Sequence, residues 1–192
     1  MTELEAINQM LVVIGSDAVN SVQAAQPDVA NARVTLDRVK QQSQRRGWWF
    51  NREFNVYYQP NDKKEIRIPS NVEAFEADDK AIIARGNKLY DLRNNTYQFE
   101  SQVLAVQTRR NLSWEELPQV FQDYVTYLAC TQFVASEELD QVLIKQLQED
   151  AQRSYLEVLR QDLAVGKYNI MENQKISANR AGIRPYNPRR FR

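Results

Sequence analysis

The chain has 192 residues, with 25 lysines and arginines, 25 aspartates and glutamates, and no histidine. The absence of histidine excludes Ser-His-Asp and Cys-His catalysis and removes the commonest transition-metal ligand, while a single cysteine excludes an intrachain disulfide and a cysteine-based zinc site. No apolar run approaches the roughly 18 residues of a membrane helix, so we expect a protein that matures in a cytoplasm and spans no membrane.

Two amphipathic helices are predicted before residue 48. The first covers 3–14, with Thr2 as its N-cap and Gly15 as its left-handed stop. The second covers 28–46 and ends at Gly47. Each helix has one apolar stripe, so each must bury that stripe against another element.

The apolar period then changes from helical spacing to alternation. Trp48, Phe50, Phe54, Val56 and Tyr58 share one parity, which predicts a half-buried strand. The later signals are a short strand at 66–68, a two-residue Gly-Asn hairpin at 86–87, a turn at 94–95 and a last strand at 103–106. Residues 48–111 therefore predict a small antiparallel sheet inserted between helices.

Helical spacing resumes at Ser113, which forms a capping-box spacing with Glu116 and predicts a helix to about Ala135. Ser136 would cap a last helix over 137–165. Its predicted buried stripe consists of Leu139, Val142, Leu147, Ala151, Tyr155, Leu159 and Leu163.

We therefore predict an α+β fold that is mainly α. An interrupted four-helix bundle (1–47 and 112–166) carries the inserted small antiparallel β-sheet subdomain (48–111) and an extended C-terminal arm (167–192). The arm holds seven basic residues against Glu172 alone, a net charge of +6, so residues 1–166 carry −6. An acidic body with a basic arm indicates an acidic partner for the arm.

Paired acids are the candidate catalytic groups, because a glycan hydrolase needs two carboxyl groups across a cleft. The pairs are Asp78-Asp79, Glu115-Glu116, Glu137-Glu138 and Glu149-Asp150. Neighbours in sequence rarely face each other across a cleft, and two of the pairs lie in predicted first helical turns. The hydrolase is thus the alternative function. We expect no catalytic residue, metal or cofactor.

Three segments together resemble the tail tubular protein A family of short-tailed podophages. They are ELEAINQMLVVIG (3–15), NARVTLDRVKQQSQRRGWWFN (31–51) and LPQVFQDYVTYLACTQF (117–133), and KYNIM (167–171) is also similar. The most specific part is the corner around Gly47, Trp48 and Phe50, which we interpret as a structural turn between helix and sheet rather than a stacking site for sugars or bases.

The resemblance implies a head-to-tail connector in the virion tail: a dodecameric ring between the portal protein and the nozzle of tail tubular protein B, with tail fibres attached nearby. DNA would pass through the ring in packaging and ejection without specific binding. In this interpretation the arm holds the portal. The expected portal-binding residues are Tyr168, Asn169, Arg180, Arg184, Tyr186, Arg189 and Arg190. A second alternative is a nucleic-acid protein that works through the arm.

Overall fold

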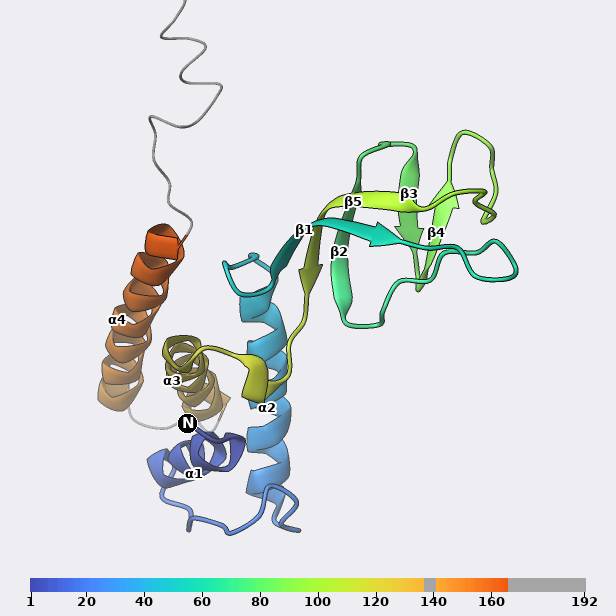
Figure 1. Ribbon diagram of the computed structural model, residues 1–192. Helices are drawn as coiled ribbons and strands as arrows, with labels where there is room; N and C mark the ends of the chain where they lie inside the picture. Colours follow the sequence, from blue (N-terminus) through green and yellow to red (C-terminus); the bar gives the residue numbers. More distant parts are fainter. Residues whose placement is uncertain (137–140, 166–192) are drawn as a thin grey trace, which may run out of the picture.

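The computed structural model describes residues 1–136 and 141–165, and its fold is α+β (Figure 1). The helices are α1 (Glu3–Val13), α2 (Pro27–Gln44), the 3₁₀ turn η1 (Trp114–Glu116), α3 (Gln119–Ser136) and α4 (Gln141–Val165). The strands are β1 (Arg52–Tyr58), β2 (Val72–Ala77), β3 (Ile82–Arg85), β4 (Lys88–Asp91) and β5 (Val103–Arg110). All five strands thus lie between α2 and η1, as the predicted insertion requires.

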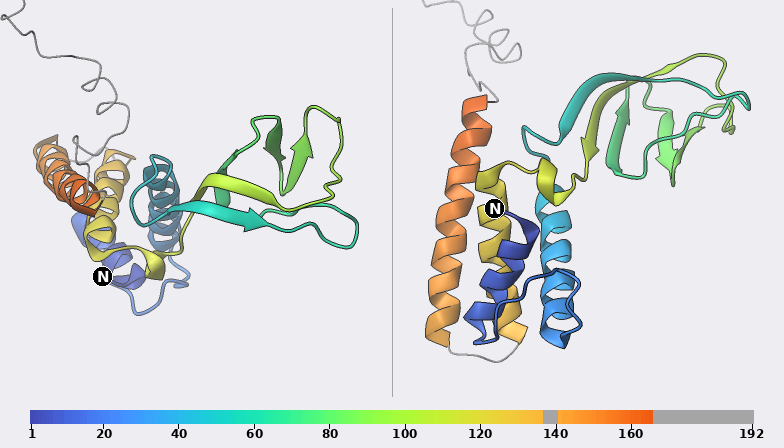
Figure 2. Two further views of the ribbon diagram at one scale, coloured as in Figure 1. Left: turned by 45° about the horizontal axis from the view of Figure 1, so that its top comes forward. Right: turned by 60° about the horizontal axis from the view of Figure 1, so that its bottom comes forward.

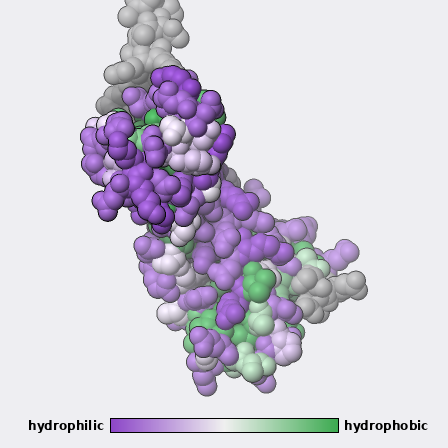
Figure 3. All heavy atoms as spheres, turned by 90° about the vertical axis from the view of Figure 1, so that its right-hand side faces the viewer, coloured by the Kyte–Doolittle hydropathy of each residue, from purple (hydrophilic) through white to green (hydrophobic). Residues whose placement is uncertain are grey.

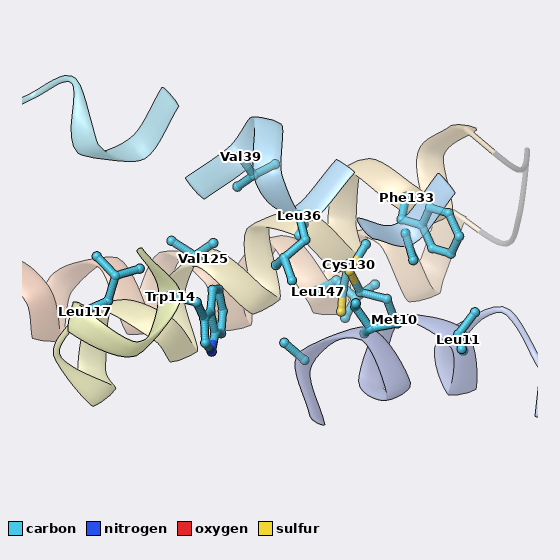
Figure 4. Packing of buried hydrophobic residues seen from close by; sticks show 14 of the residues in the cluster. Met10, Leu11, Leu36, Val39, Trp114, Leu117, Val125, Cys130, Phe133 and Leu147 are labelled. Atoms are coloured by element: carbon cyan, nitrogen blue, oxygen red, sulfur yellow. The ribbon is translucent and has the colours of Figure 1, made fainter. Parts of the chain in front are cut away.

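Helix α3 is the centre of the helical part, because α1, α2 and α4 all pack against it (Figure 2). Their shared core includes Met10 and Leu11 of α1, Leu36 of α2, Phe133 of α3 and Leu147 of α4 (Figure 4). Cys130 is fully buried in this core. Burial raises the pKa of its thiol to about 12, so it remains protonated at neutral pH.

The first two helices agree with their predicted positions to within two residues. Thr2 caps α1 in a full capping box with Glu5, and Gly15 follows with φ of +80°. Helix α2 begins at Pro27, whose missing N–H is not needed in a first turn, rather than at the predicted 28. It ends at Gln44, two residues before the predicted 46, and Gly47 has φ of +78°.

The insertion contains two small antiparallel sheets rather than one. The larger has the order β1-β5-β2, and the smaller pairs β3 with β4. The Gly86-Asn87 turn is confirmed as a two-residue hairpin, since Arg85 pairs with Lys88. Strand β2 was missed, because its acids Glu73 and Glu76 interrupt its apolar pattern.

The first predicted strand begins later than expected, and one residue that was predicted to be buried is exposed. Trp48 and Phe50 lie in a turn before β1, which begins at Arg52. Phe54 is 58% exposed although it shares the apolar parity, because its part of β1 extends beyond the β core. Residues 66–68 form no strand; they are held by an isolated bridge from Arg67, and both isoleucines beside it are buried.

The helices after the sheet also differ from prediction. Ser113 and Glu116 form their capping box on η1, not on α3, and Leu117 is extended because the residue before a proline avoids the helical region. Ser136 ends α3, and residues 137–140 lie outside the described ranges. The predicted stripe of α4 was partly wrong: Val142 and Leu163 are exposed, and Val158 and Asp162 are buried instead.

The sheet projects sideways from the end of α2 and has its own apolar core, separate from that of the helices (Figure 1). In the face shown in Figure 3 the sheet is mainly hydrophilic, and apolar side chains gather over the helical part below it. Among residues 1–136 and 141–165, no helix is long and apolar enough to cross a membrane.

The helical core can be tested with two substitutions on α2. Leu36→Ala should lower the free energy of unfolding by about 2–5 kcal/mol, because it leaves a cavity against α3. The matched control Val34→Ala removes a side chain that is 64% exposed and should change it by less than about 0.5 kcal/mol. Urea unfolding followed by circular dichroism measures both; equal effects would contradict the packing described.

Candidate functional site

The chain passes from helices to sheet at a corner built around Trp48. This side chain is 1% exposed, and its indole N–H donates to the carbonyl oxygen of Ser43 at 2.8 Å. Its ring meets that of Phe121 edge-on, with centroids 5.6 Å apart. Phe50 meets the same Phe121 ring at 4.8 Å. The corner thus inserts two aromatic rings against α3, and packing explains Trp48 without a ligand.

Gly47 makes the turn that allows this insertion. Its φ of +78° lies in the left-handed region, where a side chain is strained. A Cβ there would also lie 3.4 Å from the Cδ of Arg52 and 3.5 Å from the Cδ of Arg109. The aliphatic parts of these two arginines therefore cover the glycine backbone.

A buried asparagine connects both crossings between helices and sheet. Asn51 Nδ2 donates to the carbonyl oxygen of Gln44, at the end of α2, at 3.1 Å, and to that of Arg110, at the end of β5, at 2.9 Å. Its Oδ1 accepts the backbone N–H of Trp48 at 2.8 Å. The outgoing and returning chains are therefore held together by one side chain, which is 2% exposed.

Gln44 binds the segment that follows β5. Its amide Nε2 donates to Asn111 Oδ1 at 2.9 Å and to the carbonyl oxygen of Leu112 at 3.1 Å, while its Oε1 accepts the N–H of Leu112 at 2.8 Å. The side chain is fully buried. All its polar atoms have partners, so burial of the amide carries no unmet hydrogen bond.

The far end of α4 is attached to the same corner by a carboxylate. Asp162 Oδ1 accepts the backbone N–H of Trp49 at 2.9 Å and lies 3.6 Å from Nη2 of Arg52. Sequence analysis missed this residue, although it lies four positions after the buried Val158, where an apolar side chain is expected. A polar residue at an apolar position was the available signal.

A groove runs between the end of α2, α3 and α4. Its volume is about 640 Å³, and its lining includes Arg46, Tyr124, Leu128, Gln148 and Tyr155. The Arg46 guanidinium donates to the Tyr155 hydroxyl and lies 4.8 Å from the centre of the Trp48 ring, within the range of a cation–π contact. The pair Arg45-Arg46 follows the last helical residue, Gln44, where positive charge is favourable at the negative end of the helix dipole.

The paired acids do not form a catalytic dyad in the described residues. Asp79 pairs with Arg93 at 3.3 Å, and Asp150 pairs with Arg153 at 2.8 Å. The pKa of Glu116 is lowered, chiefly by hydrogen bonds from the backbone and side chain of Ser113, whereas a general acid needs a raised pKa. The pair at 137–138 lies outside the described ranges. No observation here favours the hydrolase.

No group of three or more acidic or cysteine side chains that could hold a metal ion occurs in the described part of the chain. The predicted portal-binding residues belong to the C-terminal arm. Tyr168, Asn169, Arg180, Arg184, Tyr186, Arg189 and Arg190 all lie outside the described residues.

These features define a structural class: an α+β protein whose buried amides and aromatic corner join a helical part to a projecting sheet. A comparison with known protein families identifies the family. The model of the family described as "Tail tubular protein" matches residues 4–168. The chain therefore belongs to the tail tubular protein family, which is a family of structural phage tail proteins. The virion tail is accordingly its location.

A curated relative agrees with this assignment. The tail tubular protein A of Klebsiella phage KP34 is 32% identical to this chain over 125 residues. The aligned region covers 62% of this chain and 64% of the relative, so the two are similar over somewhat less than two thirds of either.

Asn51→Leu tests the connection at the corner. The substitution keeps the side-chain size but leaves the buried Trp48 N–H without its acceptor, and should lower the free energy of unfolding by about 1–3 kcal/mol. Asn71→Leu, at an exposed position, is the matched control and should be nearly neutral. Denaturant unfolding measures both. If the two variants behave alike, the corner amide contributes nothing.

Proposed function

We propose that this protein is the ring-forming adaptor that connects the portal protein to the tail nozzle. The observation that carries the proposal is membership of the tail tubular protein family over residues 4–168, and the relative is named tail tubular protein A. In this role twelve copies form a ring, with the portal on one side and the nozzle protein, tail tubular protein B, on the other.

The division of the chain suits an adaptor. In our proposal the helical part (1–47 and 112–166) packs as a bundle and forms the ring. The inserted sheet (48–111) faces the nozzle and the tail fibres. Two separate apolar cores support this division, since each part has its own source of stability. The corner around Trp48 would keep the two parts in a fixed orientation, as a load-transmitting joint requires.

The exposed face of α4 suits packing against ring neighbours. Leu156 and Leu163 lie seven residues apart on one face of this helix and are 46% and 58% exposed. Apolar side chains exposed along one helix are typical of surfaces that another chain covers. Subunits arranged in this way would bury them in the assembled ring.

The charges of the chain suit a DNA channel. Residues 1–166 carry a net charge of −6, and acidic groups facing the channel would repel phosphates and let DNA slide during packaging and ejection. The arm (167–192) carries +6 and would reach the portal, where its arginines would pair with carboxylates. Tyr168 and Tyr186 are its proposed aromatic anchors.

Deletion of residues 170–192 tests the arm. The truncated chain should fold with an unchanged unfolding midpoint, because no described core residue is removed, but it should fail to enter tails. Complementation of a phage lacking the gene, followed by immunoblotting of purified particles, measures incorporation. Normal incorporation would refute the arm's role.

Electron microscopy of the full chain mixed with purified portal protein tests the adaptor role itself. We expect a twelve-fold ring on the narrow end of the portal. A chain that binds the nozzle protein but never the portal would refute the proposal.

A further inference from the structure

Three arginine side chains gather where α2 meets the sheet, and we call Arg46, Arg52 and Arg109 the arginine corner. Arg52 and Arg109 lie directly opposite each other in the β1–β5 ladder, an arrangement of like charges that is unfavourable by itself. Only Arg52 has a carboxylate partner in the described residues, Asp162 at 3.6 Å. The corner therefore has more positive charge than its surroundings neutralise.

Arg109 is the least satisfied of the three. Its Nε is buried and has no hydrogen-bond partner, and the side chain makes no ion pair within residues 1–136 and 141–165. Buried polar groups are normally paired. The side chain as a whole is half-buried, so an acceptor from outside the chain would reach the terminal nitrogens of its guanidinium rather than the buried Nε.

The corner forms a hollow beside an exposed aromatic ring. A concavity of about 270 Å³ is lined by Arg46, Gly47, Glu76, Arg109 and neighbouring residues. Phe54 projects from the same face of the sheet, because the directly opposed pairs Phe54–Gln107 and Arg52–Arg109 are two residues apart along each strand. Arginine and aromatic side chains together are typical of the centres of protein interfaces.

Two other stretches of the chain carry acidic residues without basic neighbours in sequence. Met1 to Ala32 contain four acidic residues and no lysine or arginine, and residues 111–136 contain three acidic residues and again no basic one. These stretches meet in space, since the Trp114 indole N–H donates to the carbonyl oxygen of Met1 at 3.0 Å. We call Glu3, Glu115 and Asp123 the acidic end.

The positive charge near the acidic end is the N-terminal ammonium group of Met1, which donates to the side chains of Gln119 and Gln122 rather than to a carboxylate. None of its three carboxylates forms an ion pair with a basic side chain in the described ranges. The segment between the two acidic stretches, 33–110, holds 15 basic against 10 acidic residues and includes the whole arginine corner. One molecule thus presents two complementary surfaces.

We propose that the arginine corner of one copy binds the acidic end of a second copy, with Arg109 donating to a carboxylate. Two different surfaces that bind each other make a head-to-tail contact, which repeats from copy to copy and closes into a ring. This inference rests on the ring of the proposed function and names the surfaces that form it. We favour a carboxylate of a second copy over DNA phosphate, because the net charge of −6 on residues 1–166 repels a long polyanion.

A charge-exchange experiment on the full chain tests the contact. Arg109→Glu and Glu115→Arg should each weaken self-association about tenfold or more at low salt, where screening is weak. The double variant carries both exchanged charges and should recover most of the loss. Sedimentation velocity of the free chain measures the association, and ring formation on purified portal protein is scored in parallel by electron microscopy.

Two control variants show whether weaker association comes from the loss of the Arg109 charge or from a loss of folding. Lys80→Glu makes the same change of charge at an exposed loop residue and should leave association unchanged. Arg109→Met keeps the aliphatic part that covers Gly47 but removes the charge, so it should weaken association while the melting temperature stays close to that of the wild type.

The outcomes distinguish this inference from the proposed function. Rings on the portal that tolerate Arg109→Glu, or a double variant no better than the single ones, overturn the inference and leave the adaptor role standing. Absence of any wild-type ring on the portal overturns the adaptor role. Loss of DNA binding in Arg109→Glu with unchanged self-association would overturn the inference in favour of a phosphate site.

Discussion

Two buried carboxamides, those of Asn51 and Gln44, hold both places where the chain passes between helices and sheet. Together they bind the end of α2, the end of β5 and the segment that leads to η1. A buried amide is stable only when its donors and acceptors are matched. These bonds therefore impose one geometry on the junction, and the orientation of the projecting sheet depends on it.

The aromatic and charged groups of the corner build on that geometry. The turn at Gly47 directs Trp48 and Phe50 toward Phe121 and brings Arg52 within reach of Asp162. Helix α4 packs mainly on α3, so its link to the corner fixes the end from which the arm continues. In the adaptor role that we propose, such a joint would transmit force between the ring and the distal tail.

Some expectations failed because local patterns do not report tertiary surroundings. Phe54 follows the apolar parity of β1 but is exposed, since the small β core ends before it. Strand β2 carries two glutamates and was missed, yet it forms one edge of the sheet through backbone pairing with β5. Asp162 takes a core position of α4 that only the distant Trp49 N–H and Arg52 make favourable.

The sequence by itself determined the α+β class, the first two helices, the Gly86-Asn87 hairpin and the family, because these depend on capping, turn chemistry and residue order along the chain. It also determined the division of charge between body and arm. Only the tertiary structure decided which polar side chains are buried at the corner. Residues 44, 51 and 162 meet there from separate segments, and a hydrogen bond between distant residues has no periodic signature.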